Sequence, residues 1–431
     1  MLLIYTHKIT PRVTYITRQV FSRILGIEIG HTTAVEDFIK HKGPKITYTR
    51  QPLQNEFFIQ SSELLFQQGI EEVDIQMATW EDLPCFFSSA PRSNVPFDIL
   101  AASFYLLSRY EEYLPHVRDQ HGRFPPAESI AYQHDFLRLP LVDLWANKLL
   151  DKLRERFPEI LTDRKPYKFT PIVDVTISHC YAHRGFFRGM AGFVLDLSRL
   201  KFKRMWERLR VSFNPALDPY DNFDRLIALD QQYKARTMFF FQFAEYSTYD
   251  KNLSTNSNAF KHLIKSVADY CIVSLAVSYA AAEEPETLKE EKKRLSAVIH
   301  RPVAYARMRY NRVEIPNTYR KLVDAEFSRD FSMGYTHEIG FRASTCTPFF
   351  FYDIALETQQ PIQICPFAFH DYALTPYTSE ETLLSELDEV FKSVKSVKGR
   401  LIPVFSNELL GGDQKINWLE LYEKIIRRYH A

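Results

Sequence analysis

One carboxylate stands out because it interrupts an apolar run. Residues 171–175 read Pro-Ile-Val-Asp-Val, so Asp174 is the only charged residue of the run, and polar, glycine-containing sequence follows as far as Gly185. This pattern is typical of a buried strand that carries an acid to its carboxyl end, where α/β enzymes place their chemistry. The alternative is that Asp174 caps the next segment or pairs with an arginine.

Length and charge narrow the classes of protein to which the chain can belong. Its 431 residues exceed the size at which one hydrophobic core usually keeps growing, so two domains are expected. The net charge is only +1 and no nucleic-acid-binding module is recognisable, so a nucleic-acid partner is not expected. The first residues, Met-Leu-Leu-Ile-Tyr, are too short for a signal-peptide core, and no apolar run approaches ~20 residues. These features predict a cytoplasmic protein.

The cysteines argue against a disulfide framework and against a cysteine-based zinc site. They are widely scattered, odd in number and without a close pair, at positions 85, 180, 271, 346 and 365. A reducing compartment fits this usage best.

Residues 1–165 are predicted to form a mixed α/β domain. Strands are expected over 2–5, 27–29 and 46–48, and helices over 12–25, 97–114 and 141–157. The polar end of the helix over 97–114 carries Arg109, Glu111 and Glu112, which are expected to be solvated and salt-bridged. The polar segment 162–168 is the candidate linker to a second domain.

Strands and helices alternate from about residue 166 to residue 431. Strands are expected over 171–175, 237–243, 272–277, 303–307, 362–365 and 401–405, with helices over 223–233, 260–270, 285–298, 316–326, 380–394 and 418–429. Repeated βα units imply a parallel sheet, and their number suits a barrel better than an open sheet. The expected fold class is therefore α/β, with the N-terminal domain followed by a distorted (β/α) barrel.

The segment from Arg184 to Arg210 is locally basic. It holds eight Arg and Lys against two acids, so eight minus two gives +6, and aromatic residues such as Phe202 and Trp206 are interleaved with them. A basic amphipathic helix of this kind can lie on an anionic membrane or grip a phosphorylated glycan carrier. The alternative is a solvated helix that packs on its own domain.

Several short motifs taken together resemble the polysaccharide deacetylase family. They are Val-Asp-Val-Thr at 173–176, Tyr-Ala-His-Arg-Gly at 181–185, Ser-Tyr at 278–279, Pro-Asn-Thr-Tyr-Arg at 316–320, Asp-Phe-Ser-Met-Gly-Tyr at 330–335, Gly-Phe-Arg-Ala-Ser-Thr-Cys-Thr-Pro-Phe at 340–349 and Asn-Glu at 407–408. The sequence Leu-Ser-Arg-Tyr-Glu-Glu-Tyr at 107–113 resembles the N-terminal domain of a subgroup common in Bacteroidetes. The resemblance covers nearly the whole chain and implies a deacetylase-like barrel.

The resemblance also implies a chemistry. The family uses a divalent metal such as zinc, held by one Asp and two His, an Asp that takes a proton from water and a His that protonates the leaving amine. It assigns the place of the base to Asp174, with Arg307 and Asp371 as its partners at the catalytic site.

Four positions depart from the subgroup's pattern in a way that affects this chemistry. Thr176 stands in place of a second Asp, Ala276 and Arg309 in place of two His, and Ser406 in place of the acid His. Alanine cannot ligate a metal, a serine hydroxyl is a poor acid at neutral pH, and an arginine brings a permanent positive charge to the place of a cation. The base at Asp174 is then vestigial.

The sequence therefore predicts a pseudoenzyme without a cofactor. It is expected to bind a glycan or glycan precursor, including a lipid-linked one, in cell-envelope polysaccharide metabolism, with peripheral contact to the inner membrane through the segment from Arg184 to Arg210. The residues expected to contact the ligand are Arg309, Asn407, Glu408 and Tyr279.

The alternative is an active carbohydrate N- or O-deacetylase with a rearranged metal site. His179 and His183 are spaced i, i+4 after Asp174, and His337 and His370 lie on segments expected near the active face of the barrel. Ordinary exposed or capping histidines also account for all four.

Overall fold

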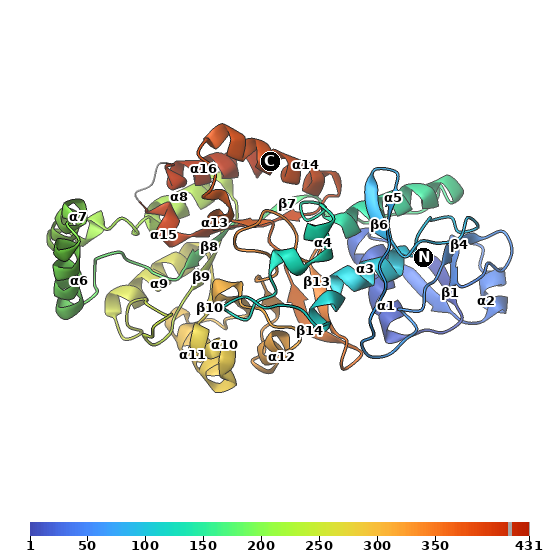
Figure 1. Ribbon diagram of the computed structural model, residues 1–431, viewed down its shortest axis with the longest axis horizontal. Coiled ribbons are helices and arrows are strands. Elements are labelled where there is room, and N and C mark those ends of the chain that lie inside the picture. The colour runs from blue at the N-terminus through green and yellow to red at the C-terminus, as the bar shows by residue number, and fades with distance from the viewer. Residues whose placement is uncertain (413–415, 431) are drawn as a thin grey trace.

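The structure, a computed structural model, describes residues 1–412 and 416–430, and the side chains of 186–188 lie outside that description. Figure 1 shows an elongated molecule with a small N-terminal sheet at one end, a large curled sheet in the middle and a pair of helices at the other end. The pair consists of α6 (Phe186–Ser198) and α7 (Phe202–Phe213).

The N-terminal sheet is parallel, and within the described residues it has four strands in the order β2–β1–β3–β4. The strands are β1 (Leu2–Thr6), β2 (Ile29–Thr32), β3 (Lys45–Thr49) and β4 (Phe57–Gln60). The other elements of this region are α1 (Pro11–Thr17), the π-helical η1 (Arg18–Ile24), α2 (Val35–Lys40), the hairpin of β5 (Met77–Trp80) and β6 (Leu83–Phe86), α3 (Ile99–Leu107), η2 (Tyr110–Tyr113), η3 (Pro126–Glu128), α4 (Ile130–Gln133) and α5 (Leu141–Arg156).

The large sheet curls into a distorted barrel, in which β8 to β12 are neighbours in chain order. Its described strands follow the order β13–β14–β12–β11–β10–β9–β8–β17–β15, all parallel except β13, and the sheet stays open between its edge strands β13 and β15. The strands are β8 (Ile172–Val175), β9 (Met238–Phe241), β10 (Ile272–Val277), β11 (Tyr305–Met308), β12 (Arg329–Asp330), β13 (Phe349–Asp353), β14 (Thr358–Ile364), β15 (Phe369–His370) and β17 (Pro403–Ser406). The expected α/β barrel is confirmed.

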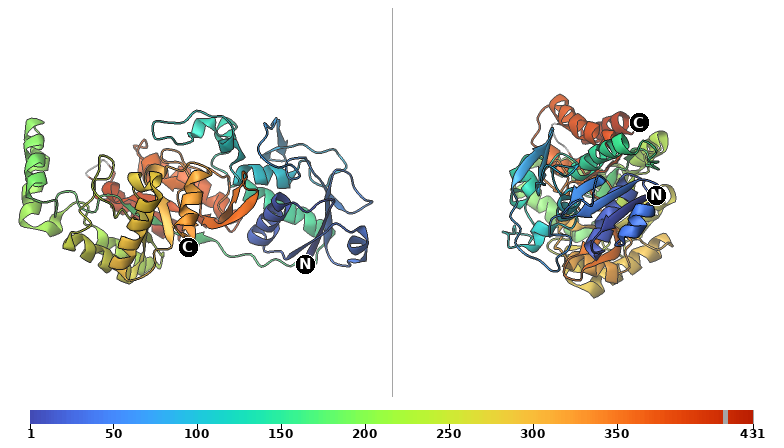
Figure 2. Two further views of the ribbon diagram at one scale, coloured as in Figure 1. Left: turned by 90° about the horizontal axis from the view of Figure 1, so that it is seen from below. Right: turned by 90° about the vertical axis from the view of Figure 1, so that its right-hand side faces the viewer.

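Helices cover the outside of this sheet (Figures 1 and 2). The covering helices are α8 (Phe223–Tyr233), α9 (Asn258–Tyr270), α11 (Pro285–Ile299), α12 (Asn317–Asp324), α14 (Glu380–Ser396) and α16 (Trp418–Tyr429). The shorter η4 (Pro215–Leu217), α10 (Tyr279–Glu283), η5 (Arg309–Asn311), α13 (Asp371–Leu374) and α15 (Asn407–Leu410) lie in the connections that follow the carboxyl ends of the strands. The short strands β7 (Lys168–Phe169) and β16 (Arg400–Leu401) pair beside the barrel. Because β8, β9 and β17 are buried along their whole length, they read as nearly continuous apolar runs.

Most of the predicted elements are present, and β10 and α16 have the predicted bounds. The strand predicted over 27–29 is displaced, since β2 begins at Ile29. The helix predicted over 97–114 is shorter, because α3 ends at Leu107 and Arg109 adopts a left-handed conformation with φ 54°. The strand β13 has no counterpart among the predicted elements.

The prediction that Arg109, Glu111 and Glu112 are solvated is wrong. Their exposed fractions are 1%, 8% and 6%. Arg109 and Glu112 contact Arg342 of the barrel, and Glu111 pairs with Arg109. Glu112 accepts hydrogen bonds from Arg109 Nε at 2.8 Å and from Arg342 Nε and Nη2 at 2.9 and 2.6 Å. A local charge pattern cannot reveal this burial, because the covering residues lie more than two hundred positions further along the chain.

The described residues of α6 and α7 contact each other, and the pair projects from the end of the molecule in Figure 1 and in the left view of Figure 2. They are two helices with a turn at 199–201, so the single basic helix considered from the sequence is divided. The side chains of Phe186, Phe187 and Arg188, which belong to the predicted basic segment, lie outside the described residues. Among the described helices, none is long and apolar enough to cross a membrane.

Removing one charge from the buried network at Arg342 should destabilise the protein strongly. Glu112→Gln leaves the buried guanidinium of Arg342 without its carboxylate and Arg109 with Glu111 alone, and breaking a buried pair in this way costs ~3–5 kcal/mol. Urea unfolding followed by circular dichroism should show a clear fall of the midpoint. The control is Glu155→Gln, which faces Lys152 on the exposed side of α5 and should leave the midpoint in place. Equal midpoints for both variants would contradict the prediction.

Candidate functional site

A cavity of about 280 Å³ lies at the carboxyl ends of the barrel strands. Its lining includes residues from β8, β10, β11, β15 and β17 and from the loops that follow them: Asp174, Thr176, Ile177, Ala276, Arg307, Met308, Arg309, Tyr310, Asn311, Thr336, His370, Tyr372, Ser406 and Glu408. The volume is near the lower end of the range found for small-ligand sites, ~300–1,000 Å³. Parallel strands bring their carboxyl ends to one edge of a barrel, which is why residues so far apart in sequence meet here.

Asp174 forms a buried ion pair with Arg307 at the floor of the cavity. Arg307 Nε lies 2.9 and 2.7 Å from the two carboxylate oxygens, and the guanidinium also donates to the carbonyl of Phe331. The Phe367 ring lies 4.7 Å from the centre of the same guanidinium. Burial opposes the charge on Asp174, but Arg307 and His370 outweigh burial and lower the pKa of this carboxyl.

His370 lies between two carboxylates. Its Nε2 is 3.6 Å from Asp174 Oδ2, and its Nδ1 is 2.6 Å from Asp371 Oδ1. Burial opposes the imidazolium, but Asp371 and Asp174 outweigh it and raise the pKa of His370. Asp371 also accepts hydrogen bonds from the backbone N–H and the hydroxyl of Ser406, at 2.6 and 2.7 Å. Asp371 is fully buried behind the cavity wall.

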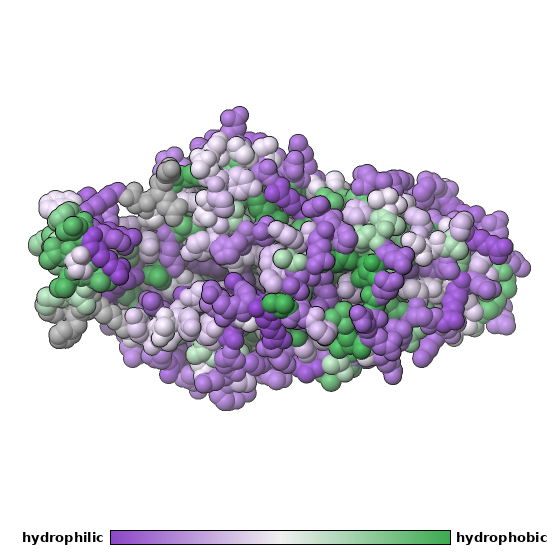
Figure 3. All heavy atoms as spheres, in the orientation of Figure 1, coloured by the Kyte–Doolittle hydropathy of each residue, from purple (hydrophilic) through white to green (hydrophobic). Residues whose placement is uncertain are grey.

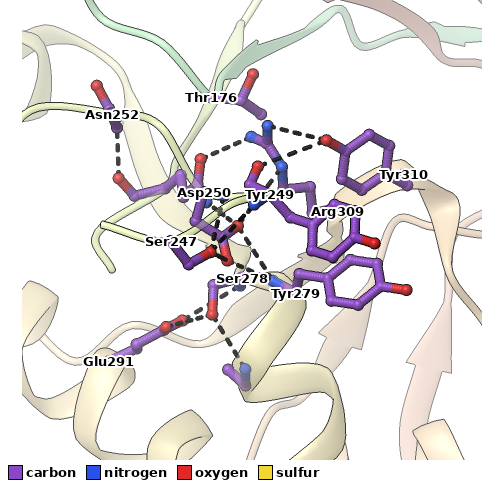
Figure 4. Close-up of polar contacts among 12 residues, drawn as sticks. Thr176, Ser247, Tyr249, Asp250, Asn252, Ser278, Tyr279, Glu291, Arg309 and Tyr310 are labelled. Carbon is purple, nitrogen blue, oxygen red and sulfur yellow. Dashed lines mark hydrogen bonds and ion pairs between the residues drawn. The ribbon is translucent and has the colours of Figure 1, made fainter. Parts of the chain in front are cut away.

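Arg309 lines the opposite part of the cavity and is held by three groups (Figure 4). Its Nη1 donates to Gln242 Oε1 at 2.6 Å, its Nε lies 3.5 Å from Asp250 Oδ1, and the Tyr310 ring lies 4.8 Å from the guanidinium centre. Asp250 also accepts from Gln242 and from the backbone N–H of Tyr279. The guanidinium is therefore fixed in place by two residues of the connection between β9 and α9 and by the ring that follows it in η5.

Glu408 is a buried carboxyl group that is partly protonated at neutral pH. Thr176 donates its hydroxyl hydrogen to one carboxylate oxygen of Glu408, while the other oxygen is buried and makes no hydrogen bond to the described protein. Burial raises the pKa of Glu408 to about 7, although the hydrogen bond from Thr176 by itself lowers this pKa. At pH 7 this group exists in both protonation states, so it can donate to or accept from a ligand.

Seven of the ten site residues named from the sequence line this cavity, and three lie outside its wall. Asp371 stands behind His370 and Ser406. Asn407 is fully buried, and its amide donates to the carbonyls of Ile177 and Tyr220 at 3.1 Å. Tyr279 stacks on Tyr249 with ring centroids 4.1 Å apart.

The residues present do not fit the metal that the resemblance implies. Ala276 offers no donor, Thr176 is bonded to Glu408, Ser406 is bonded to Asp371, and Arg309 brings a fixed cation into the same cavity. Of the four histidines considered as substitutes, His370 lines the cavity, whereas His179 and His183 contact each other at 5.2 Å between ring centroids. The fourth, His337, lies against the ring of Tyr372. Across the described chain, no three His, Cys, Asp or Glu side chains gather as metal ligands.

Four residues that shape the site were not singled out from the sequence. Tyr310 and Tyr372 supply aromatic surface to the cavity wall, and Gln242 and Asp250 fix Arg309. Because Tyr310 follows Arg309 directly, its place near the site could have been inferred from the sequence. Asp250 gives no local signal, since it lies in an irregular loop beyond β9.

One family model and several solved structures match parts of this chain. A family described as a family of unknown function (DUF7033) matches residues 2–158, and no curated protein matches the chain. Among solved structures, a putative polysaccharide deacetylase from Mycobacterium smegmatis aligns at 11% identity and TM-score 0.40, covering 63% of this chain and 89% of its own.

Two further structures align in the same range. Puue allantoinase shows 11% identity and TM-score 0.40, covering 73% of this chain and 91% of its own. A probable polysaccharide deacetylase from Pseudomonas aeruginosa PAO1 shows 13% identity and TM-score 0.38, covering 62% and 88%. Likenesses this weak say nothing about what the present chain binds.

The raised pKa of Glu408 should be visible as a pH dependence of stability. Between about pH 4.5 and about 7 the folded state keeps a proton that the unfolded state loses, so stability falls as the pH rises through this window. Glu408→Gln should remove that part of the dependence, by up to about 3 kcal/mol. Urea unfolding of both proteins at several pH values measures the difference. For the control Glu155→Gln, the difference in unfolding free energy from the parent should not change with pH. If the free energies of Glu408→Gln and the parent also change in parallel with pH, the raised pKa is not that of Glu408.

Proposed function

We propose that this protein is a deacetylase-like protein that binds a glycan or glycan precursor in the barrel cavity and has lost metal-dependent catalysis. The observation that carries the proposal is the guanidinium of Arg309, which lines the cavity and is fixed by Gln242, Asp250 and Tyr310. A permanent cation held in this way disfavours a divalent metal at the same place and favours a ligand with oxygen acceptors.

The distribution of polar groups supports a neutral, hydroxyl-rich ligand. Asp174 is already neutralised by Arg307, whereas Glu408 has an oxygen without a hydrogen-bond partner and a pKa of about 7. Arg309 and Glu408 can therefore donate to and accept from hydroxyl groups. Tyr310 and Tyr372 offer ring surface on which the apolar face of a sugar can pack. A role in cell-envelope polysaccharide metabolism follows from the resemblance to deacetylases.

One feature favours the rival function, an active N- or O-deacetylase. His370 contacts both Asp174 and Asp371, and its raised pKa lets it carry a proton near neutral pH. Such a group could serve as an acid or base if a metal or water were positioned beside it. Metal content and acetate release separate the two functions.

Binding should depend on the residues that face the cavity. A glycan array identifies the best ligand, and calorimetry then measures its affinity for variants. Arg309→Gln and Tyr372→Ala should each weaken binding, the former about 10-fold or more, because a hydrogen bond from a charged group contributes ~1.5–3 kcal/mol. Arg312→Gln is the matched control, since this arginine stacks on Tyr279 outside the cavity wall and should have no effect. An array without a hit, or a hit that survives both cavity variants, would remove the support.

Purified protein should not take up stoichiometric metal or release acetate. After incubation with zinc, cobalt or nickel and removal of excess metal, elemental analysis should find no stoichiometric ion. Acetylated chitooligosaccharides should release acetate only at the background rate, since losing both the metal and a general acid, the latter alone worth ~10²–10⁴-fold, removes most of the acceleration. Stoichiometric metal together with acetate release that Asp174→Asn abolishes would establish the rival function.

Restoring the missing side chains tests the same proposal from the other side. The combined change Thr176→Asp, Ala276→His, Arg309→His and Ser406→His introduces ligands and an acid at four positions that line one cavity. The variant should bind zinc if these positions correspond to those of active deacetylases. If it keeps the circular dichroism of the parent but binds no metal, the residue correspondence is wrong.

A further inference from the structure

The α6–α7 pair carries an apolar stripe that nothing in the described chain covers. On α7 the side chains of Phe202, Trp206 and Phe213 are 63%, 65% and 88% exposed, and Leu209 lies between them. At about 100° per residue, positions 202, 206, 209 and 213 fall within a ~60° arc of the helix surface. Met190, Val194 and Leu197 form a similar exposed row on α6, and green surface gathers over the two helices in Figure 3. A helix of a globular domain normally buries its apolar residues, and a contiguous exposed apolar surface marks a site of interaction with a partner or a membrane.

The exposed charges of the pair have one sign. Among the described residues of the pair, the exposed charged side chains are all cationic: Arg199, Lys201, Lys203, Arg204 and Arg210. Both acids of the pair are engaged, since Asp196 accepts from Arg208 at 2.9 Å and Glu207 accepts from the hydroxyl of Tyr181 at 3.2 Å. Positions 203 and 210 fall beside the stripe at about 100° per residue, so cations border the apolar surface.

We propose that the α6–α7 pair docks this protein on a membrane surface that contains anionic phospholipid. Exposed aromatic and aliphatic side chains bordered by cations are suited to the boundary between acyl chains and negatively charged headgroups. A second copy of the chain fits less well, because a symmetric contact through this face would bring rows of like charge together. The pair belongs to the connection that follows β8, whose carboxyl end lines the cavity, so it lies on the loop side of the barrel. The proposal is independent of glycan binding.

Trp206 reports directly on this contact. The chain has four tryptophans, all in the described part, and Trp80, Trp145 and Trp418 are buried. With the full chain, vesicles of phosphatidylcholine and phosphatidylglycerol should shift the tryptophan emission to the blue, and brominated acyl chains should quench it. Vesicles of phosphatidylcholine alone should have little effect, and high salt should reverse the change. Trp206→Phe should abolish the emission change while co-sedimentation with the anionic vesicles persists.

Variants separate the apolar and electrostatic parts. Trp206→Ser with Phe213→Ser should abolish co-sedimentation. Combining Arg199→Gln, Arg204→Gln and Arg210→Gln should weaken it about 100-fold, near five-fold for each cation. The matched control combines Lys293→Gln, Lys392→Gln and Arg427→Gln, exposed cations on the barrel helices, and should bind as the parent does.

Three results would overturn the proposal. They are failure to bind anionic vesicles, equal binding to neutral vesicles without salt dependence, and equal losses in the barrel control. Concentration-dependent self-association that Trp206→Ser with Phe213→Ser removes would assign the stripe to a contact between copies instead.

Discussion

The buried ion pair between Asp174 and Arg307 is the interaction on which the rest of the site depends. It joins β8 to β11, which are separated by two strands of the sheet, so it crosses the interior of the barrel. Neither charge could be buried alone without a cost of several kcal/mol. Because each satisfies the other, the floor of the cavity is electrically neutral, and the charge that remains available to a ligand comes from Arg309 and Glu408.

The barrel could be predicted because its strands are buried on both faces. Such strands appear in sequence as short apolar runs, and a single carboxylate among them, Asp174, is conspicuous for the same reason. The other cavity residues came from the resemblance to deacetylase motifs, and they lie together because carboxyl ends of parallel strands meet at one edge. The surroundings of Arg309 could not be predicted, since Gln242 and Asp250 come from a connection whose path depends on the assembled barrel.

The error at Arg109 and Glu112 has a related physical cause. A cluster of charges at a helix end is normally solvated, and only a partner with the right geometry can make its burial favourable. Arg342 supplies that partner by pairing with both oxygens of Glu112. In the basic segment, by contrast, the composition indicated an unusual surface, but only the fold shows that Phe202 and Trp206 are exposed.

The same network ties the N-terminal region to the barrel, because Glu112 pairs with Arg342. The segment 331–348 between β12 and β13 is irregular, and it contributes Thr336 to the cavity wall. The N-terminal region holds it at several points: Glu112 binds Arg342, Asp143 accepts from Thr345 at 2.6 Å, and the carbonyl of Leu137 accepts from the backbone N–H of Phe341 at 2.8 Å. An irregular segment that lacks a ladder of its own needs such partners for its buried polar groups. The N-terminal region therefore holds the segment that contributes Thr336 to the cavity wall.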